Sequence, residues 1–93
     1  MAVEVKIPPV LRKYTAGSPM VAASGSTIVE LLRDLEANWP QLQGQVIDEH
    51  GETHRFINIY RNGEDIRYLE RLNTAIKDGD VVAILPAVAG GRS

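Results

Sequence analysis

Two adjacent glycines, Gly90 and Gly91, lie near the C-terminal end of the sequence, after the small residues Ala87-Val88-Ala89. A backbone without Cβ atoms can pass through a channel that is too narrow for side chains. From Pro86 to Gly91 the chain could reach about 20 Å from a folded domain, at roughly 3.3–3.6 Å per residue. A carboxylate brought into an active site in this way becomes reactive when ATP adenylates it, and a sulfur nucleophile that displaces AMP then leaves a thiocarboxylate. The glycine pair alone is a weak signal, because many frayed chain ends contain glycine.

The other side chains offer little further chemistry. The sequence contains no cysteine, so it can form no disulfide, persulfide or thioester on its own side chains. His50 and His54 have the spacing of some zinc-binding pairs, but Gly51 lies between them and no convincing third ligand accompanies them. No serine, threonine or carboxylate falls in a recognisable nucleophile and base motif. We therefore expect no catalytic residues and no metal site, and we expect that the protein is not an enzyme.

The charge and hydrophobicity of the chain exclude two classes of function. Its 93 residues carry a formal net charge of −2, whereas nucleic-acid-binding domains are usually basic. No apolar run approaches the length of roughly 18 residues that spans a membrane. The first seven residues alternate charged and branched side chains and do not resemble a signal peptide. We expect a cytoplasmic protein that binds neither nucleic acid nor membranes.

The first half of the sequence predicts a hairpin followed by a helix. Residues 3–7 alternate apolar and polar side chains, and the short apolar segment 20–23 can pair back with them. Thr27 and Glu30 have the spacing of a capping box. An apolar stripe at helical spacing follows, and the helix should close at Trp39-Pro40. A short second helix is expected around residues 42–47.

The second half of the sequence predicts a loop over residues 48–54, a second hairpin and a final strand. The hairpin joins residues 56–60 to residues 66–69 through an Asn62-Gly63 turn. The apolar run 81–85 suits a fully buried central strand, and Pro86 should end its pairing. This element order predicts an α+β protein with the β-grasp (ubiquitin-like) fold, a mixed sheet of about four to five strands covered by one main helix. We expect one domain over residues 1–86 and a flexible tail over residues 87–93.

The whole chain resembles the ThiS/MoaD group of ubiquitin-like sulfur carriers, and within it the actinobacterial branch that serves cysteine synthesis. The segments that carry the resemblance are Asp34-Leu35-Glu36-Ala37-Asn38, His54-Arg55-Phe56-Ile57-Asn58-Ile59-Tyr60, Thr74-Ala75-Ile76 with Asp78-Gly79-Asp80, and Ile84-Leu85-Pro86-Ala87-Val88-Ala89-Gly90-Gly91. The last of these is the most specific.

The resemblance implies that Gly91 carries first an adenylate and then a thiocarboxylate. An activating enzyme of the ubiquitin-activating type would supply the ATP chemistry, and the carrier itself would bind no cofactor. In the cysteine branch a cysteine synthase accepts the sulfur and a zinc metallopeptidase releases cysteine. Carriers for thiamin, molybdopterin or a thiosugar, a ubiquitin-like protein modifier and a passive β-grasp interaction domain are the alternatives.

The resemblance also assigns roles to surface and tail residues. Ala87, Val88, Ala89 and Gly90 would thread into the active site of a partner enzyme. Relatives that are ready for activation end at the second glycine, so Arg92 and Ser93 are either removed by a peptidase or left by recombinant expression. Carriers of this shape dock through the sheet surface beside the tail, for which the candidate residues are Phe56, Ile57, Ile59, Tyr60, Arg61, Arg67 and Leu69. Most of the apolar residues in this set are also expected to belong to the core. Arg71 and Lys77 could extend a basic face beside them, suited to an acidic patch on a partner.

Overall fold

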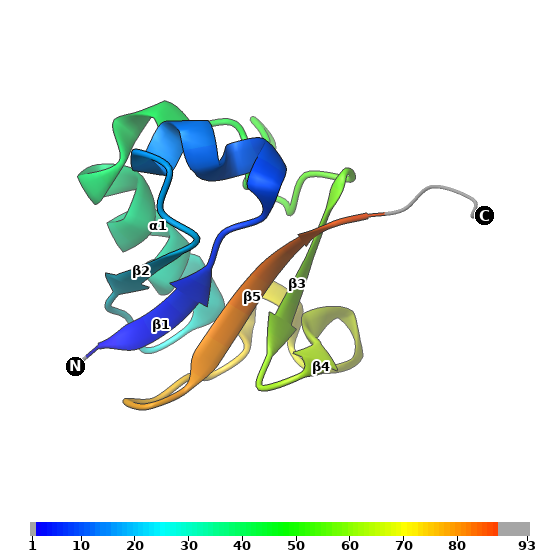
Figure 1. Cartoon of the computed structure of the whole chain (residues 1–93). Helices are drawn as coiled ribbons and strands as arrows, with labels where there is room; N and C mark the ends of the chain where they lie inside the picture. Colours follow the sequence, from blue (N-terminus) through cyan, green and yellow to red (C-terminus); the bar gives the residue numbers. More distant parts are fainter. Residues whose placement is uncertain (1, 88–93) are drawn as a thin grey trace.

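A computed structural model describes residues 2–87 of the chain. Within these residues a five-stranded mixed sheet has the order β2-β1-β5-β3-β4, and one α-helix covers one face of it (Figure 1). The bounds are β1 Val3–Lys6, β2 Met20–Ala23, α1 Ile28–Asn38, β3 Ile57–Arg61, β4 Glu64–Asp65 and β5 Val81–Pro86. Short 3₁₀ helices span Pro9–Thr15, Pro40–Leu42, Ile66–Tyr68 and Arg71–Asn73. No helix of this part of the chain could cross a membrane.

The predicted N-terminal hairpin is confirmed. β1 and β2 pair antiparallel, with Val3 opposite Ala23 and Val5 opposite Val21. Val3 and Val5 are buried, because the apolar positions of the alternating pattern all face the helix side of the sheet. β1 also pairs in parallel with β5, so the first and last strands lie together at the centre of the sheet.

Strand β5 is central, as predicted, but it is not buried on both sides. Val82 and Ile84 are fully buried, whereas Leu85 is 41% exposed and Val81 and Ala83 are half-buried. The prediction of a fully buried strand was wrong, because α1 lies on only one face of the sheet. The other face of β5 is left open to solvent or to a partner.

Helix α1 begins and ends where its sequence signals place it. The Thr27 side chain accepts the backbone N–H of Glu30, and the Glu30 carboxylate accepts the backbone N–H of Ser26, one residue before the usual capping-box partner. The predicted apolar stripe is fully buried and comprises Ile28, Leu31, Leu32 and Leu35. This stripe anchors the helix to the inner face of the sheet.

Gly25 lies so close to the first turn of α1 that no side chain fits there. A Cβ at this position would lie 2.5 Å from the backbone nitrogen of Leu31 and 2.9 Å from the carbonyl carbon of Glu30. We expect Gly25→Ala to lower the free energy of unfolding by about 3 kcal/mol, because backbone must move to make room. The matched control is Gly51→Ala, where the added Cβ meets nothing within 4 Å and only the positive φ of 78° is strained, at about 1 kcal/mol. Equal losses in urea unfolding would contradict the clash.

The predicted second helix is reduced to one 3₁₀ turn, Pro40–Leu42. Gly44 has a φ of 84°, which ends helical geometry before Val46 is reached. Val46 and Ile47 are buried without being helical, and Ile47 forms an isolated bridge with Thr53. The loop predicted over residues 48–54 is therefore closed by the bridge between Ile47 and Thr53, and the buried side chains of Val46 and Ile47 just before it belong to the core.

The second hairpin has its predicted turn but a shorter second strand. Asn62 and Gly63 both have positive φ, as a two-residue hairpin turn requires. The Asp65 carboxylate accepts the backbone N–H of Arg67 and starts the 3₁₀ turn Ile66–Tyr68. The prediction of a strand over residues 66–69 was therefore wrong, and β4 pairs with the last two residues of β3 alone.

Candidate functional site

The candidate site begins where β5 leads into the C-terminal residues. β5 pairs antiparallel with β3 through Pro86, which lies opposite Ile57, and the backbone N–H of Ala87 donates to the carbonyl of Phe56 at 2.8 Å. Pairing therefore continues one residue beyond Pro86. Because hydrogen-bonded and non-hydrogen-bonded pairs alternate in an antiparallel ladder, Pro86 occupies a position whose missing N–H costs no bond to β3.

The residues predicted to carry the chemistry lie beyond this point. Val88, Ala89, Gly90, Gly91, Arg92 and Ser93 are outside the described residues. Their roles as threading residues, sulfur carrier and removable extension stay predictions, as does the boundary between the domain and its tail. What the structure does describe is the surface from which this segment departs.

Asp80 ties the start of β5 to the turn between β3 and β4. Its buried carboxylate accepts the side-chain N–H groups of Arg61 at 3.2 Å and Asn62 at 3.1 Å, and the backbone N–H of Lys77 at 2.9 Å. The Asn62 side chain in turn accepts the N–H of Val81. The Asn62 amide, followed by the Lys77 N–H and Arg61, holds the pKa of Asp80 below its ordinary value. This network fixes the start of β5 against the turn between β3 and β4, and so helps to orient β5 and the residues that follow it.

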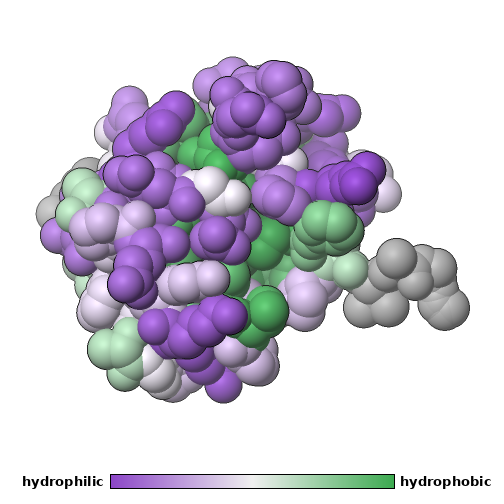
Figure 2. Space-filling view, turned by 90° about the horizontal axis from the view of Figure 1, so that it is seen from above, coloured by the Kyte–Doolittle hydropathy of each residue, from purple (hydrophilic) through white to green (hydrophobic). Residues whose placement is uncertain are grey.

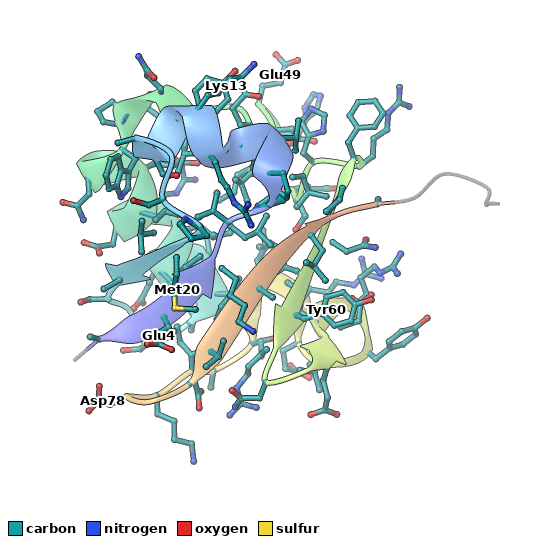
Figure 3. All side chains as sticks on the ribbon, in the orientation of Figure 1. Glu4, Lys13, Met20, Glu49, Tyr60 and Asp78 are labelled. Atoms are coloured by element: carbon teal, nitrogen blue, oxygen red, sulfur yellow. The ribbon has the colours of Figure 1, made fainter. Side chains whose placement is uncertain are left out.

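The open face of the sheet presents apolar side chains near the end of β5, where Pro86 and Ala87 lead into the C-terminal residues; we call this point the tail exit. Residues directly opposite each other share a face, so Ala83 and Tyr60 lie side by side, and so do Leu85 and Asn58. Met20, at 41% exposed, extends this face to the β2 edge (Figure 3). Figure 2 shows apolar side chains beside the point where the described chain ends. An open apolar face of this kind is suited to contact with another protein.

The predicted docking residues divide into buried and exposed groups. Ile57 and Ile59 point into the core, and Leu69 packs half-buried against it. Phe56 is 60% exposed, and Arg67 is exposed. Tyr60 and Arg61 are half-buried. Of the predicted set, therefore, Phe56, Tyr60, Arg61 and Arg67 are available at the surface.

Leu85 and Met20 were not among the predicted docking residues. Both lie on the open face and are equally exposed. The run Val81 to Leu85 is apolar at every position, so its pattern could not show which alternate residues face outward. Met20 could have been found from the register of the first hairpin, because it lies opposite the outward-facing Lys6.

Two arginines of the predicted basic face are already paired within the chain. Arg61 contacts Asp80 at 3.2 Å, and Arg67 contacts Asp65 at 2.8 Å. The Arg67 side chain holds the pKa of Asp65 below its ordinary value. Arg71 forms no ion pair with any described residue.

The two histidines lie in the loop before β3. The ring of His54 lies 5.0 Å from the ring of Phe56, and its Nδ1 accepts the Phe56 backbone N–H at 3.4 Å. His50 is exposed. Residues 2–87 contain no group of three or more His, Cys, Asp or Glu side chains that could hold a metal ion.

Comparison with known proteins agrees with this geometry. The sulfur carrier protein CysO of Mycobacterium tuberculosis is 50% identical over 93 residues, which cover 98% of this chain and 100% of that protein. A chain of the BexX/CysO complex of Amycolatopsis orientalis superposes with a TM-score of 0.88 at 44% identity, over 97% of this chain and 100% of that one. Small archaeal modifier protein 3 of Haloferax volcanii is 39% identical over 66 residues, 71% of each chain.

The β-grasp fold and the prediction of a carrier, a protein substrate and not an enzyme, are confirmed by these comparisons. The model of the ThiS family matches residues 5–91, which include every strand after the first two residues of β1 and extend through both glycines. The chain belongs to the ThiS family.

Proposed function

We propose that this chain carries sulfur as a thiocarboxylate on Gly91. The observation that carries the proposal is the extent of the family match, which runs to residue 91 and leaves out Arg92 and Ser93. The match therefore ends at the second glycine, the residue whose carboxylate the chemistry requires. The CysO relatives support the same role.

The reaction requires activation by a partner enzyme. Transfer of AMP from ATP to the Gly91 carboxylate releases pyrophosphate and leaves an acyl adenylate. A sulfur nucleophile then attacks the carbonyl carbon and displaces AMP, which leaves the thiocarboxylate. The absence of cysteine means that this chain cannot supply that sulfur from its own side chains. ATP and the sulfur donor therefore belong to partner proteins in the cytoplasm.

The residues after Gly91 must be removed before activation. Arg92 and Ser93 follow Gly91 in the sequence, so the Gly91 carboxylate is held in a peptide bond until they are cleaved off. We propose that a peptidase cleaves after Gly91 where Arg92 and Ser93 are part of the natural chain. The resemblance to the cysteine branch implies a cysteine synthase as the acceptor and a zinc metallopeptidase that releases cysteine, and we propose these partners. Thiamin, molybdopterin and thiosugar synthesis are the other acceptor pathways.

Intact-mass measurement tests the proposal directly. The protein is isolated from its native host and incubated with ATP, a sulfur donor and host extract. A chain that ends at Gly91 should gain the mass that corresponds to one oxygen replaced by sulfur. A chain that ends at Gly91 and never gains this mass under conditions that activate a CysO relative would refute the carrier role, and a passive interaction domain would then be the better account.

We expect the open sheet face to hold the partner enzyme while the tail reacts. Leu85→Glu places a charge on this face two residues before Ala87 and should raise the KM of the activating enzyme for the carrier about tenfold, because an apolar contact is replaced by a desolvated carboxylate. The chain of Amycolatopsis orientalis that was solved in a complex supports docking of this kind.

The control for Leu85→Glu is Ala37→Glu, an equal charge change at an exposed position of α1 on the covered side of the sheet. Ala37→Glu should leave KM within about twofold of the wild type. Thermal unfolding of both variants checks that the fold is intact. Equal KM values for the two variants would show that the partner does not use the open face.

A protein modifier is the second candidate function, because a small archaeal modifier protein is among the relatives. In that case the activated Gly91 would acylate a lysine amine and form an isopeptide bond. A digest that cleaves after basic residues would leave residues 78–91 joined to the modified lysine, because Lys77 is the nearest basic residue before Gly91. Such remnants on other proteins in cell digests would favour this function, and a search that finds thiocarboxylate without them would exclude it.

A further inference from the structure

A basic groove lies beside β3, on the side away from β5. β4 pairs with Tyr60 and Arg61 alone, so among the described strands none covers the first three residues of β3 on this side. The space between β3 and the segment 66–73 forms a groove of about 460 Å³. Ile57, which lines it, also pairs with Pro86 next to the tail exit. The groove therefore starts close to the point where the chain leaves for its partner.

Three arginines line this groove, and two of them have no acidic partner. Arg67 is paired with Asp65, but Arg55 and Arg71 form no ion pair with any residue that the structure describes. Glu52 is the remaining acidic residue of the lining. Leu72, which is half-buried, adds apolar surface. The groove thus carries an excess of positive charge on a chain whose overall charge is negative.

Two exposed aromatic side chains stand next to the groove, each with an arginine over its ring. Phe56 is 60% exposed with the Arg55 guanidinium 5.2 Å from its ring centre, and Tyr68 is 83% exposed with Arg67 at 6.0 Å. Tyrosine and arginine are enriched among the residues that dominate binding energy in protein interfaces. Both aromatic side chains are therefore accessible to another protein.

Arg71 occupies a backbone conformation that favours glycine. Its φ is 53°, and the turn is closed by the Thr74 N–H, which donates to the Arg71 carbonyl at 3.0 Å, and by the Thr74 hydroxyl, which accepts the Glu70 N–H. Glycine adopts this φ without a steric penalty, whereas a side chain does not. Strain of this kind occurs at functional sites as well as in turns, which makes Arg71 a position to test.

We propose that this groove binds an extended acidic segment of the enzyme that activates the Gly91 carboxylate. The inference rests on the proposed function and adds the chemistry of the partner. Carboxylates of the segment pair with Arg55 and Arg71, and an apolar side chain of the segment lies against the half-buried Leu72. The open sheet face and the groove then hold the carrier at two places around the tail exit. The net negative charge of the chain disfavours a nucleic acid as the occupant.

The test uses the purified activating enzyme of the same host and carrier that ends at Gly91. Arg71→Gly relieves the left-handed strain while it adds backbone freedom to the unfolded chain, so Tm should stay within about 4 °C of the wild type. The same variant should raise the KM for the carrier about tenfold, and Arg55→Glu with Arg71→Glu about a hundredfold with a weaker dependence on salt. If Arg71→Gly keeps its Tm but has a raised KM, then the Arg71 side chain contacts the enzyme and does not merely stabilise the turn.

The matched control is Lys13→Glu with Arg33→Glu, which makes the same charge change at exposed positions outside the groove and should alter KM less than about threefold. Wild-type KM in the Arg71→Gly and double arginine variants would overturn the groove as a docking site while the carrier function stands. Failure of the wild type to form an adenylate would overturn the proposed function, and the inference with it. Binding of a single-stranded RNA probe that is lost in the same variants would overturn it in favour of a nucleic acid.

Discussion

A chain shortened to end at Gly90 is expected to lose thiocarboxylate formation by more than about a hundredfold relative to a chain that ends at Gly91. Without Gly91 the terminal carboxylate is withdrawn by one residue, roughly 3.3–3.6 Å, from the position at which a partner enzyme adenylates it. A misplacement of about 1 Å at a reacting group already costs about a hundredfold in rate. The chain that ends at Gly91 is the matched control, because the two proteins differ by one glycine.

The same truncation should leave stability unchanged. Within residues 2–87, the buried apolar core runs from Val3 to Ile84, and the truncation removes none of these residues. Intact mass measures thiocarboxylate formation, and thermal unfolding measures stability. A shortened chain that is converted as fast as its control would show that the reaction does not take place at Gly91. A fall in Tm of more than about 4 °C would show that the terminal residues contribute to the fold.

Asp80→Asn is expected to lower the free energy of unfolding by about 3 kcal/mol. Asp80 is only 8% exposed, and its carboxylate accepts hydrogen bonds from Arg61, Asn62 and the Lys77 backbone. The amide has one acceptor oxygen where the carboxylate has two, so at least one buried donor loses its partner and Arg61 loses its counter-charge. Because the network anchors the start of β5, unfolding should become easier without loss of the hydrophobic core.

The control is Asp78→Asn, two residues away. Asp78 is exposed and accepts one hydrogen bond, from the backbone N–H of Ala2 at 3.0 Å. This change should cost less than about 1 kcal/mol. Urea unfolding at pH 7 compares the two variants. A loss for Asp80→Asn no larger than that for Asp78→Asn would show that the buried network does not stabilise the protein.

The pH dependence of stability follows from the same carboxylates. Hydrogen bonds lower the folded-state pKa of Asp80, and Arg67 lowers that of Asp65. Their contribution is complete above the unfolded pKa and is lost as the pH falls through the lowered folded value. Burial raises the pKa of Glu36 in the folded state, so its effect has the opposite sign. As the pH rises from the ordinary, unfolded-state pKa of Glu36 through the raised folded-state pKa, the stability of the protein falls. Asp80→Asn should therefore flatten the acid side of the stability curve.

Most of the elements could be predicted because their signals lie within short stretches of chain. The alternation of residues 3–7, the capping residues Thr27 and Glu30, and the Asn62-Gly63 turn each produced the expected element. The failures also had local causes that periodicity does not reveal. Gly44 has a positive φ, which prevents a second helix from continuing past residue 42. The Asp65 side chain accepts the Arg67 N–H and begins a 3₁₀ turn, so β4 ends at Asp65.

The candidate site was predictable in its chemistry but not in its surroundings. The glycine pair and the absence of cysteine are properties of the sequence, and they restrict the chemistry to the terminal carboxylate. The docking residues were harder to identify, because exposure depends on what other segments cover. Ile57 and Ile59 were candidates for both docking and the core and lie in the core, whereas Leu85, expected in a fully buried strand, is exposed.

The sequence by itself determined the order of elements and the covalent chemistry that is open to this chain, and it is the basis of the proposal that Gly91 carries the sulfur. These follow from the identities and spacing of neighbouring residues. Only the tertiary structure decided that one face of β5 is open, that Asp80 joins two turns and that Arg55 and Arg71 line a groove near the tail exit. The physical reason is that burial and charge pairing depend on contacts between segments far apart in the chain, and such contacts exist only after folding.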